Sequence, residues 1–239
     1  MVHISEPEPH HHGNGIYLKD LVYGAVDGTV TTFAVVAGVA GAALSPAIVL
    51  ILGFANLFAD GFSMAISNYL SIKADRDYAA RARKRETWEV ENTPDEEREE
   101  IREILLKKGF NGKELETAVE IITSNKEHWI DTMMHEELGI MVGNNDPKKH
   151  ALATFLSFVL VGIIPLLAYV LSYFLPFFAE RTFVISAVLT SFTFFLVGAA
   201  KTFFTKQNWM VSGIRTFAIG GLAAVVAYGM GAFIKTLVG

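Results

Sequence analysis

The stretch that decides the fold is "LVYGAVDGTVTTFAVVAGVAGA", residues 21–42. It is apolar and long enough to cross a bilayer, which takes about 20 helical residues for roughly 30 Å of hydrocarbon. Asp27 nevertheless lies in its first half. An ionised aspartate in hydrocarbon costs at least about 2.5 kcal/mol, so it is retained only where a cation, a proton or a polar partner compensates. The stretch therefore indicates a membrane helix with a functional carboxylate.

Four further apolar runs reach spanning length. With the first run they predict five spans, at residues 21–43, 46–72, 151–174, 183–204 and 211–234. The short link "ALSP" offers Ser45 as a cap and Pro46 as the first helical residue, so the first two spans are expected to be antiparallel neighbours. Pro165 predicts a kink in the third span.

Charge is concentrated in one part of this cysteine-free, 239-residue chain. Between residues 73 and 149 lie 19 of the 25 acidic and 14 of the 20 basic residues. This contrast predicts a membrane protein with one polar insert, and the lack of a coherent basic face argues against a nucleic-acid partner. Without cysteine the chain has neither disulfides nor thiolate metal sites.

The predicted fold class is all-α, a five-span helical bundle with an acidic three-helix insert between spans two and three. Lys and Arg gather at the span ends that face the insert, which places the insert and the N-terminus in the cytosol and the C-terminus on the far side. Helix starts are expected at Thr93, through a capping box with Glu96, at Asn111 and near Asn125. The expected parts are a disordered tail (1–16), which lacks signal-peptide features, spans one and two (17–72), a cytosolic metal-binding domain that continues the second-span helix (73–149), and spans three to five (150–239).

A polar stripe runs along the second span. Asn56, Asp60, Met64 and Asn68 recur every four residues, near one face of the helix. With Asp27 on the neighbouring helix they predict a polar seam whose oxygen and thioether ligands suit Fe(II) or Mn(II) better than Mg(II). The alternative is a hydrogen-bonded seam without transport, but two carboxylates on adjacent spans favour a cation pathway.

The insert offers a second set of candidate metal ligands. Carboxylates three residues apart face one way on a helix, and thioethers lie close to the last one in sequence. The candidates are Glu86, Glu89, Glu97, Glu100, Met133, Met134 and Glu137. The alternatives are that Arg85, Arg98 and Arg102 neutralise a solvated face, and that the methionines belong to the core.

Several stretches together resemble the vacuolar iron transporter family. They are "DGTVTTFAVVAGVAGA", "FADGFSMAISNYLS", "RETWEVE" and "WIDTMMHEELG", and the resemblance runs from Tyr17 to the C-terminus. It implies a five-span homodimer with its pathway at the dimer interface, which exports iron, and also manganese, from the cytosol in exchange for protons. Asp27 and Met64 match pathway ligands of the family. The glutamates and methionines of the insert match a cytosolic metal-collecting site.

The chain departs from plant members at Asn68, where they commonly have a glutamate, while Asp60 supplies a carboxylate two turns earlier. No prosthetic group is expected; Fe(II) and Mn(II), with Co(II) and Zn(II) as further candidates, are substrates. The expected location is the inner membrane of a bacterium or a vacuolar or other endomembrane of a eukaryote. The His10–His12 run is left out of the sites.

Two other classes of function remain open. One is a membrane-anchored di-iron oxidoreductase, although such centres typically use Glu-x-x-His pairs and the insert has Glu127 and His128 adjacent. The other is a metal-sensing adaptor, in which the spans only anchor. An anchor has no need of aspartates inside two helices.

Overall fold

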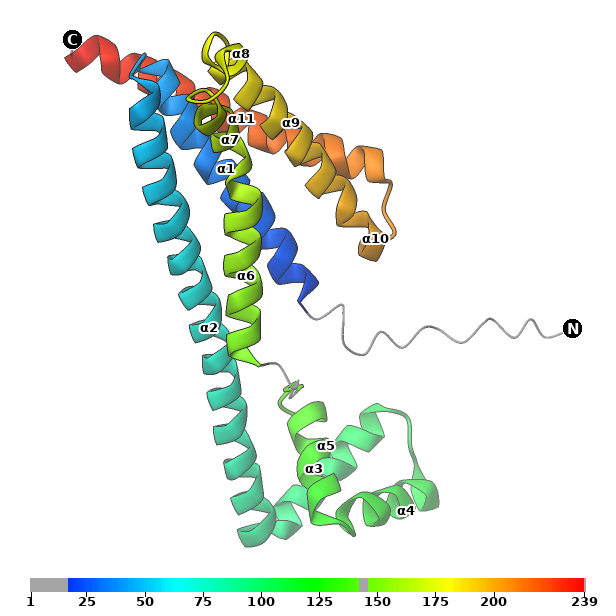
Figure 1. Ribbon diagram of the computed structural model, residues 1–239. Helices are drawn as coiled ribbons and strands as arrows, with labels where there is room; N and C mark the ends of the chain where they lie inside the picture. The colour runs from blue at the N-terminus through cyan, green and yellow to red at the C-terminus, as the bar shows by residue number, and fades with distance from the viewer. Residues whose placement is uncertain (1–16, 142–145, 239) are drawn as a thin grey trace, which may run out of the picture. The chain divides into compact units, whose positions relative to one another are not determined.

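The computed structural model describes residues 17–141 and 146–238, and the regular structure of these residues is helical. They fall into two compact units, shown in Figure 1: a membrane unit (residues 17–69 and 146–238) and an insert (residues 70–141). Helix α2, Pro46–Asn92, contributes to both units and runs without interruption, as the sequence predicts. The expected tail 1–16, with His10–His12, lies outside the described residues.

The membrane unit contains four helices that are long and apolar enough to cross a bilayer, namely α1, α2, α9 and α11. The bent pair α6 and α7 qualifies as a fifth span if it is counted as one. Its 41° bend falls beside Pro165 in the first turn of α7, which confirms the predicted kink. The helices besides α2 are α1 (Leu18–Gly41), α6 (Pro147–Gly162), α7 (Ile164–Leu171), α8 (Pro176–Ala179), α9 (Thr182–Ala200), α10 (Thr202–Thr205) and α11 (Trp209–Val238).

Helix α1 packs against α6 and α11 through backbone contacts. A Cβ added at Gly28 would lie 2.4 Å from the carbonyl oxygen of Phe158 on α6, and one at Gly41 would lie 2.2 Å from that of Tyr228 on α11. Glycines at these positions let the helix axes approach closely, which drives helix association in lipid. Gly28 and Gly41 thus serve the packing of these helices.

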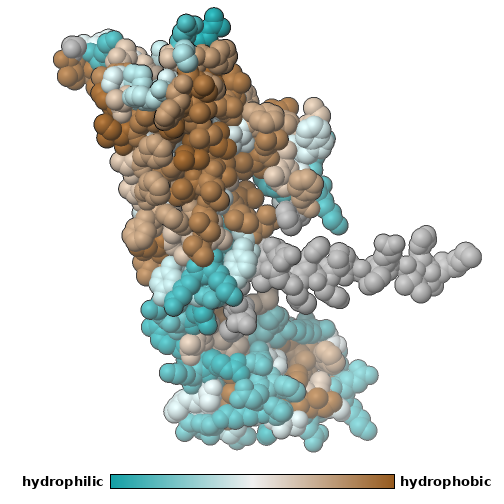
Figure 2. Space-filling view, in the orientation of Figure 1, coloured by the Kyte–Doolittle hydropathy of each residue, from teal (hydrophilic) through white to brown (hydrophobic). Residues whose placement is uncertain are grey.

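Helix α2 meets its neighbours differently. At Gly53 and Gly61 an added Cβ would meet the side chains of Leu166 and Phe158, not backbone atoms. Leu57 of α2 is fully buried in an apolar cluster that also contains Phe158 and Leu166. The outward face of the membrane unit is correspondingly hydrophobic, as the brown surface in Figure 2 shows.

The insert consists of the polar end of α2 with α3 (Pro94–Lys107), α4 (Gly112–Thr123) and α5 (Lys126–Glu136). The three predicted starts are confirmed, and the Asn125 side chain accepts hydrogen bonds from the backbone of Glu127 and His128. The predicted capping box is wrong. The Thr93 hydroxyl donates to the carbonyl oxygen of Glu89 at 3.1 Å and forms no cap bond; the same carbonyl oxygen also accepts from the Thr93 backbone nitrogen at 2.8 Å.

The core of the insert is small and apolar. Ile101 of α3 and Ile130 of α5 are at most 1% exposed and pack with Leu115, Val119 and Trp129. Arg83 ties α2 to α5 through ion pairs with Glu127, at 2.6 Å, and Asp131. These contacts bring the ends of three helices together around a group of acidic side chains.

Candidate functional site

Five glutamates from three segments of the insert form what we call the glutamate cluster. Its members are Glu86 and Glu89 on α2, Glu97 and Glu100 on α3, and Glu137 at the end of α5. Glu86 and Glu97 are 2% and 5% exposed, and each has a buried carboxylate oxygen without a hydrogen-bond partner. Buried, unsatisfied carboxylates are costly, so an apo cluster of this kind favours binding of protons or cations.

The ionisation of the cluster reflects that cost. Burial, followed by repulsion from Glu137 and Glu89, raises the pKa of Glu86 to about 7. Burial and repulsion from Glu100 and Glu86 raise the pKa of Glu97 to about 7, and burial with repulsion from Glu100 raises the pKa of Glu137. The cluster therefore holds protons near neutral pH that a divalent cation can replace.

The nearby arginines leave most of this charge uncompensated. Arg85 pairs with Glu89 at 3.0 Å. Arg102 pairs instead with Glu99 and, at 2.9 Å, with Glu116. The Arg98 guanidinium lies 5.7 Å from the centre of the Trp129 ring. The sequence left open that Arg85, Arg98 and Arg102 neutralise the glutamates. Of these three arginines, only Arg85 forms an ion pair with a member of the glutamate cluster.

The two methionines lie in the core of the insert, since Met133 is fully buried and Met134 is 2% exposed. This position agrees with the alternative that the methionines are core residues. The carboxylates of the glutamate cluster are then the remaining candidate ligands. Across residues 17–141 and 146–238, no three His, Asp or Glu side chains are drawn together in a coordinating arrangement. The cluster is close enough to interact electrostatically, but its oxygens are not gathered around one point.

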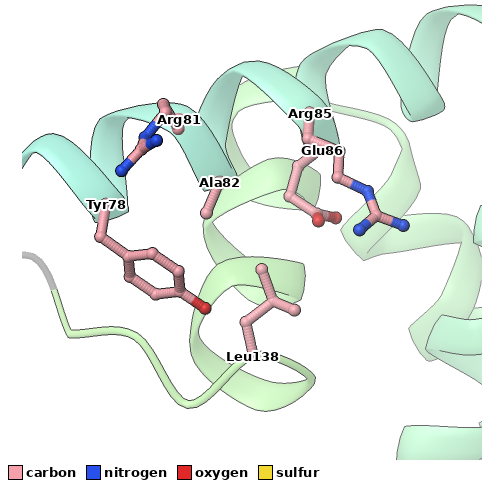
Figure 3. A pocket seen from close by; sticks show the side chains of 6 residues that line it. All are labelled: Tyr78, Arg81, Ala82, Arg85, Glu86 and Leu138. Atoms are coloured by element: carbon pink, nitrogen blue, oxygen red, sulfur yellow. The ribbon is translucent and has the colours of Figure 1, made fainter.

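A pocket of about 480 Å³ opens beside the cluster. Figure 3 shows Tyr78, Ala82 and Glu86 on the side of α2 that faces Leu138. Arg81 and Arg85 also line the pocket. The pocket thus opens onto Glu86, with basic as well as acidic side chains in its lining.

The residues of the predicted seam lie in the membrane unit as follows. Asp27 of α1 and Asp60 of α2 are both partly buried and near enough for their charges to repel. Met64 is partly buried against the apolar cluster of the membrane unit. The amide nitrogen of Asn56 and the hydroxyl of Thr32 are buried without a hydrogen-bond partner. Thr32 on α1 and Asn56 on α2 thus each leave a buried polar atom unpaired inside an apolar helix.

Asn68, the last residue of the predicted stripe, contacts a different group. Its amide nitrogen donates to Asp20 Oδ1 at 2.7 Å and to Thr154 Oγ1 at 2.8 Å. Asp20 Oδ2 lies 2.5 Å from His150 Nδ1. Sequence reasoning missed Asp20 and His150, although each is a titratable residue directly before a predicted span.

The fold and these two sites define a polytopic helical membrane protein with acidic groups both in its spans and in a polar insert. The sequence profile of the VIT family matches residues 18–232. The chain belongs to this family. It is 38% identical over 234 residues to a protein named vacuolar iron transporter from Plasmodium berghei, covering 95% of this chain and 85% of that one.

Other relatives carry the same name. The chain is 38% identical to the vacuolar iron transporter of Toxoplasma gondii, over 97% of this chain and 79% of the relative. It is 36% identical to vacuolar iron transporter 1 of Arabidopsis thaliana, over 91% and 86% of the two chains. The resemblance seen in the sequence motifs is thereby confirmed, and the relatives are transporters, not enzymes.

Proposed function

We propose that this chain is a membrane transporter that moves divalent iron, and also manganese, out of the cytosol in exchange for protons. The observation that carries the proposal is the pair Asp27 and Asp60, two mutually repelling carboxylates on adjacent apolar helices. A passing cation relieves that repulsion, whereas a structural seam gains nothing from it. The names of the relatives support iron as the substrate.

Asp27, Asp60 and Met64 are the proposed ligands along the pathway, with Asn56 beside them. Carboxylate oxygens with a thioether suit Fe(II) and Mn(II), and a softer ligand lowers the preference for Mg(II). We leave Asn68 out of this ligand set because its amide donates to Asp20 and Thr154. Co(II) and Zn(II) are the cations to compare.

The glutamate cluster is proposed to collect the cation before transport. Its partly protonated carboxylates release protons when a divalent ion binds, and their charge raises the local cation concentration. The Lys and Arg distribution supports a cytosolic insert and N-terminus. A homodimer with the pathway at its interface, as the family resemblance implies, fits the partial exposure of Asp60 and Met64.

The test uses the full chain in sealed proteoliposomes. Uptake of Fe(II), Mn(II), Co(II) and Zn(II) is measured with and without a pH gradient, for the wild type and for Asp27→Asn. We expect Asp27→Asn to abolish uptake while the protein remains monodisperse. Glu180→Gln, an exposed carboxylate outside the seam, is the matched control and should transport normally. Undiminished uptake by Asp27→Asn would refute the pathway.

Two alternative functions were left open by the sequence, a di-iron oxidoreductase and a metal-sensing adaptor. No observation on the described residues favours either one. A di-iron oxidoreductase needs histidines near its carboxylates, but His128 and His135 are both exposed and His135 is engaged with Glu136 at 3.4 Å. An adaptor leaves Asp27 and Asp60 without a role. Metal flux in vesicles distinguishes transport from both.

A further inference from the structure

Three helices of the membrane unit enclose a polar group that lies outside the proposed metal ligands. Asp20 is in the first turn of α1, Asn68 is on α2, and His150 and Thr154 are in the first two turns of α6. Asp20 and His150 are 6% and 5% exposed, and Thr154 is fully buried. A buried carboxylate beside an imidazole is expensive to maintain, which makes it a candidate for function.

The contacts hold this pair in one arrangement. Asp20 Oδ2 lies 2.5 Å from His150 Nδ1, and Asp20 Oδ1 accepts the Asn68 amide at 2.7 Å. Thr154 accepts from the same amide nitrogen at 2.8 Å and donates to the His150 carbonyl oxygen at 3.0 Å. The Tyr17 ring packs on the imidazole, with the ring centres 4.7 Å apart. Both carboxylate oxygens are thus engaged, and the imidazole is fixed in orientation.

The remaining imidazole nitrogen is the informative atom. His150 Nε2 is buried and has no hydrogen-bond partner among the residues that the structure describes. With Nδ1 held against the carboxylate, Nε2 is the atom that can gain or lose a proton. An N–O separation of 2.5 Å fits a shared proton. A metal ion between these two atoms would hold them farther apart, since each metal–ligand bond is about 2.0–2.2 Å long.

Other titratable groups on the three helix segments lie near the pair in sequence. On α6, Asp146 caps the helix by accepting from the Lys148 backbone at 3.0 Å, and the side chains of Lys148 and Lys149 are exposed. Of the other titratable side chains on α1 and the nearby part of α2, Lys19, Tyr23 and Lys73 are exposed, and Asp27, Asp60 and Tyr69 are partly buried.

We propose that the Asp20–His150 pair is the proton carrier of this transporter, at a place separate from the metal ligands. The inference rests on the proposed exchange of metal for protons. A proton from the far side binds His150 Nε2 and gives an imidazolium held against the Asp20 carboxylate. Loss of that proton to the cytosol restores the neutral imidazole, so one proton is taken up and one is released in each cycle.

Asn68 is a positioning residue in this arrangement. An amide nitrogen can donate to the Asp20 carboxylate, whereas an ionised glutamate at the same place would repel it. In this chain the residue that faces Asp20 is accordingly a hydrogen-bond donor. Because the proton carrier is separate from the metal ligands, we expect that proton coupling can be lost while metal passage is kept.

The experiment compares two measurements on the full chain in proteoliposomes, with radiolabelled Mn(II) as the probe. The first is uptake driven by a pH gradient; the second is exchange of labelled external for unlabelled internal Mn(II) at equal pH, which needs no net proton movement. His150→Gln and Asp20→Asn should lose gradient-driven uptake at least tenfold and keep exchange within twofold of the wild type. His128→Gln, an exposed histidine on α5, should change neither.

Each other outcome is decisive. Variants that keep gradient-driven uptake overturn the inference, and folded variants that lose both measurements overturn it too, because the pair would then be needed for metal passage itself. If His150→Gln is not monodisperse, Asp20→Asn decides, since its amide keeps the shape of the carboxylate. Wild-type vesicles that show neither uptake nor exchange would instead defeat the proposed function.

Discussion

Replacing Glu97 by glutamine should stabilise the apo insert at alkaline pH and leave it unchanged at acidic pH. Burial and neighbouring glutamates raise the pKa of Glu97 from 4.5 to about 7. The folded insert therefore binds this proton more tightly than the unfolded chain. The stabilisation is fully present below pH 4.5 and is lost as the pH rises through about 7.

The magnitude follows from the shift. One pKa unit corresponds to about 1.36 kcal/mol, so a shift of this size costs at most about 3 kcal/mol once Glu97 is ionised at pH 8. Solvent screening and relaxation of the other carboxylates reduce this figure, and we expect about 1–3 kcal/mol. Glutamine carries no charge and avoids the cost at every pH. The difference corresponds to roughly a 5- to 150-fold change in an opening equilibrium.

Hydrogen exchange of the α5 amides in the detergent-solubilised full chain, without metal, measures that equilibrium. Wild-type protection factors should fall between pH 5 and pH 8, and Glu97→Gln should restore them at pH 8 only. Glu96→Gln, an exposed neighbour on α3, is the control and should follow the wild type. An equal effect of Glu97→Gln at both pH values would mean that shape, not charge, sets the stability, and the reasoning about the cluster would be wrong.

Three further outcomes test the same structure. Addition of Mn(II) at pH 8, where Glu86 and Glu97 are ionised, should raise α5 protection in the wild type with little proton release; at pH 5.5 protons compete for the glutamates, so binding should weaken and each ion bound should release protons. Ile101→Ala, at a fully buried position in the insert core, should destabilise the insert by about 2–5 kcal/mol in denaturant titrations followed by Trp129 fluorescence, with transport lost only when the insert unfolds. Gly28→Ala should sharply lower the yield of monodisperse protein on size exclusion, because its Cβ would meet the Phe158 backbone, whereas Gly221→Ala, with nothing within 4 Å, should not.

Features that depend on local sequence could be predicted. The apolar runs, the bend beside Pro165 and the start of α5 at Asn125 each follow from residues within one or two helical turns. Asp27 and Asp60 could also be selected as candidates, because a carboxylate inside an apolar run is costly in any arrangement.

Features that depend on tertiary contacts could not be predicted from the sequence. Asp20 and His150 are 130 residues apart, and only the packing of α1 against α6 brings them together. Asn68 follows the stripe by spacing, yet its partners are set by that same packing. Thr93 has a capping sequence, but its hydroxyl donates to the carbonyl oxygen of Glu89, one turn back in the preceding helix.

The glycine contacts of α1 have a consequence for how such a molecule can move. Backbone atoms cannot rotate aside, so α1 is locked to α6 at Gly28 and to α11 at Gly41. Helix α2 rests on Leu166 and Phe158 side chains, which can change rotamer. We therefore expect α1, α6 and α11 to behave as a fixed frame and the spanning part of α2 to be the sliding element, so that Asp60 changes its surroundings while Asp27 stays in place. Spin labels on α1 and α11 should keep one separation through the transport cycle.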